Sequence, residues 1–91
     1  MDSKAKVGVD VVSVQRASML RMGQNWQKLG KINQAIDTYL RIIQDNPDTT
    51  ESEEAKAALI EIAAGFEQEG RYYLAIDIYD RLSASVAHDA A

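Results

Sequence analysis

The side chains that most often serve in catalysis or metal binding are scarce in this sequence. His88 is the single histidine and there is no cysteine, so neither a disulfide nor a thiolate metal site can form. A metal site or an activated nucleophile needs a second group of this kind within reach, and the serines stand in no recognisable catalytic motif. We therefore expect no catalytic residue, no metal, no cofactor and no enzymatic activity.

One acid-rich stretch, "DNPDTTESEEAK", has a spacing faintly like that of a calcium-binding loop. It lacks the glycine that such a loop needs at its sharp turn. A helix start explains the acids better, because Thr50 followed by Glu53 fits a capping box and the glutamates would lie at the positive end of the helix dipole. The stretch therefore predicts the beginning of a helix.

Composition indicates one small globular domain. The chain has 91 residues, of which 46% are hydrophobic and 26% charged, with a formal net charge of -4. This balance offers no basic surface for a phosphate backbone, and no apolar stretch approaches membrane-spanning length. We expect no nucleic-acid partner, no membrane partner and a cytoplasmic location.

The sequence contains an internal repeat. "GKINQAIDTY" begins at Gly30 and "GRYYLAIDIY" begins at Gly70, an offset of 70 − 30 = 40 residues. The two stretches align without gaps and share a glycine, a basic residue, an Ala-Ile-Asp core and a final tyrosine. Self-similarity at such a period is typical of repeat architectures.

Helical periodicity extends over most of the chain. Apolar residues recur at spacings of three and four, Gly30 and Gly70 supply stops, and Pro47 ends the segment before it. We predict four helices, near residues 11–29, 31–45, 51–69 and 71–86, packed as two consecutive antiparallel hairpins.

These residues resemble the tetratricopeptide repeat family, whose helix-turn-helix unit has large, small and aromatic residues at set intervals. The two sets of repeat-packing residues that carry the resemblance are Met19, Met22, Gly23, Trp26, Ala35 and Tyr39, and Leu59, Ile62, Ala63, Phe66, Ala75 and Tyr79. The resemblance implies an all-α fold with two tetratricopeptide-like hairpins in a right-handed α-solenoid array. The domain is expected at residues 10–86, with repeats at about 10–49 and 50–89, after a flexible segment at 1–9 and before a frayed tail at 87–91.

The chain departs from the family pattern in two respects. The period is 40 residues where about 34 is usual, and two units are present where about three are normally needed for stability. The additional residues fall at "TTESEE", which predicts that they lengthen the third helix at its start.

The resemblance implies binding of a peptide or a partner helix in a groove formed by the first helix of each unit. By register, the groove residues are Leu20, Gln24, Lys28, Ile60, Ala64 and Gln68. Only Lys28 is basic, so the clamp for a terminal carboxylate found in part of the family is not expected. Alternatively, Leu20 and Ile60 pack within the hairpins or against the N-terminal part of the chain.

The second copy differs from the first at three places. Asn33, Gln34 and Thr38 of the first copy correspond to Tyr73, Leu74 and Ile78 of the second. We predict that these three apolar residues, with Leu82, form a self-association surface that gives a weak homodimer. An ordinary end surface with a few exposed apolar groups is the alternative.

Two function classes lead after these considerations, and an enzyme is a distant third. The first is a non-enzymatic protein-interaction module that binds a peptide or a partner helix in an apolar groove. The second is a structural oligomerisation unit that mainly associates with itself through its last helix.

Overall fold

The computed structural model describes residues 10–90, and it describes side chains as far as Val86. Four helices occur in this range: α2 (Val11–Lys28), α3 (Ile32–Asp45), α4 (Thr50–Gln68) and α5 (Tyr72–Ala90). The described residues contain no strand. The prediction of an all-α fold with four helices is confirmed, although α5 continues to Ala90 instead of ending near residue 86. The prediction of a flexible segment at 1–9 lies outside the described residues.

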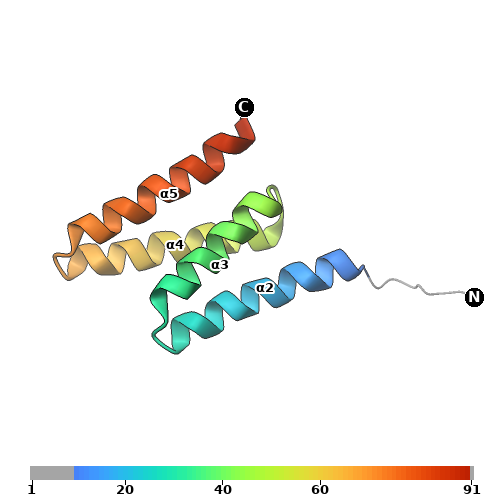
Figure 1. The fold of residues 1–91 in the computed structure, drawn as a ribbon, viewed down its shortest axis with the longest axis horizontal. Helices are drawn as coiled ribbons and strands as arrows, with labels where there is room; N and C mark the ends of the chain where they lie inside the picture. The colour runs from blue at the N-terminus through green and yellow to red at the C-terminus, as the bar shows by residue number, and fades with distance from the viewer. Residues whose placement is uncertain (1–9, 91) are drawn as a thin grey trace, which may run out of the picture.

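The helices form two antiparallel hairpins that pack side by side (Figure 1). The first hairpin consists of α2 and α3, and the second consists of α4 and α5. Between the hairpins, α3 contacts both α4 and α5, and α2 contacts α4. The right-handed solenoid array stays a prediction, whereas the hairpin architecture is observed.

The same turn closes both hairpins. Gly30 and Gly70 have φ angles of 77° and 80°, which a residue with a Cβ adopts only at a cost. The next amides, of Lys31 and Arg71, donate to the carbonyls of Trp26 and Phe66 at 2.9 and 2.8 Å. This pattern is the Schellman motif, and it explains why each glycine follows the end of a helix.

The starts of α2 and α4 are capped by side chains. Asp10 accepts a hydrogen bond from the Val12 amide, and Thr49 accepts one from the Ser52 amide at 3.1 Å. The predicted capping box at Thr50 and Glu53 is therefore wrong by one residue, because Thr49 is in the extended conformation of an N-cap and Thr50 is already helical.

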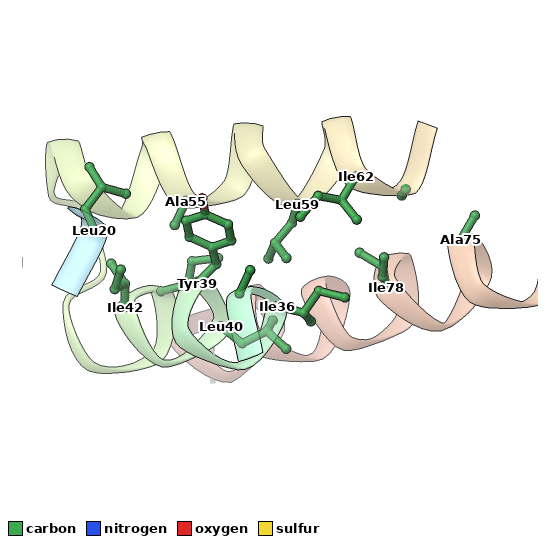
Figure 2. Packing of buried hydrophobic residues seen from close by; sticks show 13 residues of the cluster. Leu20, Ile36, Tyr39, Leu40, Ile42, Ala55, Leu59, Ile62, Ala75 and Ile78 are labelled. Atoms are coloured by element: carbon green, nitrogen blue, oxygen red, sulfur yellow. The ribbon is translucent and has the colours of Figure 1, made fainter. Parts of the chain in front are cut away.

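A single hydrophobic core joins the hairpins, with contributions from all four helices (Figure 2). Within the first hairpin, Gly23 lets α2 approach α3 closely, since a Cβ at this position would lie 2.7 Å from Cε1 of Tyr39. The buried Tyr39 donates its hydroxyl to Oε1 of Gln27 at 2.8 Å. The small residue and the aromatic ring thus fit one another across the hairpin.

The structure places most of the predicted packing residues in or against this core. The buried ones are Gly23, Ala35, Tyr39, Leu59, Ile62, Ala63 and Ala75, and those partly buried against the core are Met19, Trp26, Phe66 and Tyr79. Met22 is the exception, with 43% of its surface exposed. Its equivalent, Ile62, lies in the core between the hairpins, whereas among the described residues no hairpin precedes α2 to cover Met22.

The hydroxyl groups of the two repeat tyrosines have equivalent hydrogen-bond neighbours, although the rings differ in burial. Burial raises the pKa of the Tyr39 hydroxyl, and the negative charge of Glu61 raises it further. Desolvation also raises the pKa of Tyr79, followed by the charge of Glu67 and a hydrogen bond to it. Since 67 − 27 = 40, Glu67 occupies in the second copy the place of Gln27 in the first. Both tyrosines are therefore neutral at physiological pH.

Candidate functional site

The candidate site is a surface formed by helices. Among the side chains that the structure describes, residues 10–86, no group of three or more metal-binding residues is close enough to hold an ion. No helix in residues 10–90 is long and apolar enough to cross a membrane. What the fold presents to solvent is a set of apolar and charged side chains on α2, α4 and α5.

The predicted groove residues divide into exposed and buried ones. Gln24 and Lys28 on α2 are exposed, as are Ile60 and Gln68 on α4. Ala64 is half-buried. Leu20, at 8% exposure, belongs to the core that joins the two hairpins, so the prediction that it lines an open groove is wrong, and it is not buried inside one hairpin alone.

Leu20 and Ile60 occupy equivalent positions, because 60 − 20 = 40, yet Ile60 is 49% exposed. The difference follows from what lies next to each helix. Leu20 lies beside the first turns of α4, near Ala55 (Figure 2). Ile60 lies on α4 itself, and no further helix in the described part of the chain packs on the side away from α2.

The same contrast is found between α3 and α5. Ile36 is 4% exposed and lies near Ile62 and Ile78 of the second hairpin (Figure 2), whereas its equivalent Ile76 is 52% exposed. Ile32 packs against the core, whereas its equivalent Tyr72 is exposed. The second hairpin therefore keeps apolar residues at positions that are covered in the first hairpin only.

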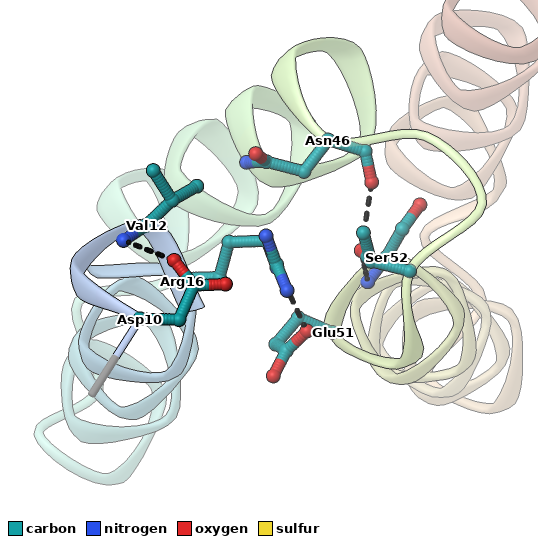
Figure 3. Close-up of polar contacts among 7 residues, drawn as sticks. Asp10, Val12, Arg16, Asn46, Glu51 and Ser52 are labelled. Carbon is teal, nitrogen blue, oxygen red and sulfur yellow. Dashed lines mark hydrogen bonds and ion pairs between the residues drawn. The ribbon is translucent and has the colours of Figure 1, made fainter. Parts of the chain in front are cut away.

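Two ion pairs connect the hairpins beside these apolar contacts. Nε of Arg16 on α2 lies 3.2 Å from Oε1 of Glu51 on α4 (Figure 3), with both side chains largely buried. Nη2 of Arg81 on α5 lies 2.8 Å from Oδ1 of Asp37 on α3. The second pair is more exposed, so its contribution to stability is smaller. Both pairs join the two hairpins in the observed register.

The predicted self-association surface is only partly exposed. Tyr73 is 90% and Leu74 40% exposed, but Ile78 is 2% exposed and Leu82 is packed against the core. The expectation that Ile78 lies at the centre of an open surface is therefore wrong. Its side of α5 faces α3 and α4, not the end of the molecule.

Ile78 is buried because its side of α5 faces the first hairpin. Leu74 and Ile78 line a hollow between α3 and α5 together with Gln34 and Ile36 of the first hairpin. They are apolar because the second hairpin has a hairpin before it. Gln34 is exposed where it lines this hollow, which suits a polar side chain.

Sequence reasoning overlooked Tyr72 and Ile76. Comparing the two copies drew attention to positions where a polar residue becomes apolar, and isoleucine occurs at both 36 and 76. The repeat itself could have indicated them: a residue that is buried between two hairpins in the first copy is exposed in a copy that has no following hairpin in the described residues.

Comparison with known families identifies one of the two units. Residues 17–49, which include most of the first hairpin, match the family model described as tetratricopeptide repeat. Neither the curated proteins nor the solved structures contain a match to the chain.

Proposed function

We propose that the chain is a non-enzymatic module that binds a segment of a partner protein, because residues 17–49 match the tetratricopeptide repeat family model. Tetratricopeptide repeats generally mediate protein–protein interaction. The proposed binding surface is the row of exposed side chains along the first helix of each hairpin, and a cytoplasmic location stays a prediction.

The chemistry of this row suits a peptide or a partner helix. Ile60 and the half-buried Ala64 offer apolar contact, while the amides of Gln24 and Gln68 can each donate and accept hydrogen bonds. Lys28 adds one positive charge at the end of α2. One positive charge attracts a carboxylate without the multiple cations of a dedicated clamp.

The observation that carries the proposal is the exposure of Ile60, which leaves about half of a large apolar side chain in water on a helix whose other large apolar residues are buried or partly buried. Removing apolar surface of this size from water stabilises a complex by about 1 kcal/mol. A central apolar contact with polar neighbours is the usual arrangement of a protein interface.

A peptide selection tests the proposal. Peptides that bind the folded chain are selected from a display library, and their contacts are mapped by amide chemical shifts. The proposal expects shifts at Gln24, Lys28, Ile60 and Gln68, and loss of binding in Ile60→Glu. Tyr73→Ser is the matched control, because Tyr73 is exposed on a different helix. Binding that survives Ile60→Glu, or that maps only to α5, would contradict a groove on the first helices.

Self-association through the last helix is the second candidate, supported by the exposure of Tyr73 and Leu74. Sedimentation velocity over a range of concentrations tests it, with Leu74→Glu beside the wild type. We use Leu74 because a charge at the buried Ile78 would unfold the core. A wild-type chain that stays monomeric at high micromolar concentration would eliminate this candidate.

A further inference from the structure

We propose that the end face of the second hairpin binds a helical hairpin of a partner protein that places a carboxylate opposite Lys56 and a basic side chain opposite Asp77. The end face is defined by Lys56 and Ile60 on α4 and by Tyr72, Ile76 and Asp77 on α5. Only Ile60 is shared with the groove of the proposed function, so the two proposals can fail separately.

In the first hairpin, the face equivalent to the end face is covered by a helical hairpin. Leu20 and Ile36 are 8% and 4% exposed because the second hairpin packs on them, and their equivalents Ile60 and Ile76 are 49% and 52% exposed. The apolar residues that accept a hairpin are thus present twice and are covered once. A face of this composition, repeated at the same register, fits the same kind of occupant.

The charges on the end face give the second, independent observation. Arg16 and Asp37 of the first hairpin each pair with a residue of the second, Glu51 and Arg81. The equivalent residues on the end face, Lys56 and Asp77, keep these signs, since 56 − 16 = 40 and 77 − 37 = 40. The face therefore retains its half of both ion pairs.

At present these two charges pair only within their own helices. Nζ of Lys56 lies 3.0 Å from Oε2 of Glu53, and Oδ2 of Asp77 lies 3.7 Å from Nη1 of Arg81. Both pairs join near neighbours on one helix and have at least one exposed partner, so they contribute little and are easily exchanged. An incoming carboxylate and an incoming base can therefore replace them.

A second copy of this chain is a poorer occupant than a different hairpin. The second hairpin meets the first through Ala55, Ala58 and Leu74, which are buried, half-buried and partly exposed. At these positions the first hairpin has Gln15, Ser18 and Gln34, all exposed. Stacking a copy head to tail would bury these polar groups against isoleucine, which costs free energy unless they find partners.

The experiment uses the full chain and a peptide probe. The probe copies the second hairpin, which occupies the equivalent face of the first hairpin. The probe is a synthetic peptide with the sequence of residues 50–90 and the substitutions I60S, Y72S and I76S, so that it cannot bind another probe. Titration into the ¹⁵N-labelled chain is expected to shift the amides of Ile60, Tyr72 and Ile76. Ile76→Glu in the chain should weaken binding about tenfold or more, whereas Tyr73→Ser should leave it within about twofold.

A charge exchange tests the predicted chemistry of the partner. Lys56→Glu in the chain should weaken binding by about twofold to fivefold, the range of an exposed ion pair. The substitution E51K in the probe should restore it. Equal binding of both probes by both chains would overturn the assignment of a carboxylate to this position.

The isolated peptide probe need not fold on its own, so a second experiment attaches the added hairpin to the chain. Residues 51–90 are repeated in place of Ala91, which keeps the register of 40, and unfolding by urea is followed. Ile76→Glu should lower the midpoint strongly in the lengthened chain and hardly at all in the natural one. If neither the titration nor this pair shows an effect of Ile76, the proposal is overturned. It is likewise overturned if the natural chain forms a dimer that Ile76→Glu dissociates, since the occupant is then a second copy.

Discussion

The first hairpin buries what the second hairpin exposes, although both follow the same sequence pattern. Tyr39, Ile36 and Leu20 are buried, and their equivalents Tyr79, Ile76 and Ile60 are half-buried or exposed. The local structure is the same in both copies, down to the turn at Gly30 and the turn at Gly70. The difference therefore arises from neighbours: the first hairpin has one on the side of α4 and α5, and the second has none among the described residues.

This comparison separates two sources of stability in one chain. Contacts inside a hairpin are made twice, whereas contacts between hairpins are made once. In a repeat protein these two contributions are the intrinsic and the interfacial terms of the free energy of folding. Equivalent substitutions in the two copies measure the interfacial term directly, because the intrinsic part is similar in both.

The largest difference is expected for the tyrosines. Tyr39→Ala should lower the free energy of unfolding by about 3–5 kcal/mol, because a fully buried ring is lost from the core. Tyr79→Ala should cost roughly half as much, because its ring is only partly buried. Urea denaturation of both variants checks this. Equal losses would mean that the two rings are equally buried in solution.

The isoleucines sharpen the same comparison. Ile36→Ala should lower the free energy of unfolding by about 2–4 kcal/mol, since Ile36 lies between the hairpins. Ile76→Ala should change it by about 0.5 kcal/mol or less, as expected for an exposed site. The measurement is again the urea midpoint. A costly Ile76→Ala would indicate that the end face is covered in solution, for instance by a second copy.

These isoleucines also show which structural features the sequence predicts and which it does not. The helices could be predicted closely because their ends depend on local chemistry: Gly30 and Gly70 permit positive φ, and Pro47 follows the end of α3. The exposure of Ile76 could not be found by comparing the copies, because Ile36 and Ile76 are the same residue. Burial at these positions depends on the neighbouring hairpin, which is not a local property.

The misplacement of Ile78 has the same origin. Ile78 replaces Thr38 of the first copy, and both positions are buried, at 2% and 9% exposure. The sequence did not tell which side of the hairpin differed, and we assigned the apolar residue to the outer end. The structure places it toward α3, where it lines the hollow between the hairpins.

The turn glycines should behave alike, in contrast to the core residues. Gly30→Ala and Gly70→Ala should each lower the free energy of unfolding by about 1–2 kcal/mol, because φ is positive at both while no atom would contact the new Cβ. Gly65→Ala is the matched control: Gly65 lies inside α4 with equally open surroundings, so alanine should raise stability by about 0.5–1 kcal/mol. Unequal losses at the two turns would contradict the equivalence of the hairpin turns.

The smallest expected effect concerns the start of α4. The Thr49 hydroxyl accepts from the Ser52 amide at 3.1 Å and donates to the Asn46 carbonyl at 2.7 Å, so Thr49→Ala removes both hydrogen bonds. We expect a loss of about 1 kcal/mol, the usual value for a lost N-cap. The neighbouring Thr50→Ala should change stability by a few tenths of a kcal/mol at most, because Thr50 is exposed in the first turn and caps nothing. Thermal unfolding of the two variants distinguishes them, and a larger loss for Thr50→Ala would restore the capping box that the sequence suggested. The result bears on the comparison of the hairpins, since Glu51, which holds Arg16 of the first hairpin, lies in the turn that Thr49 caps.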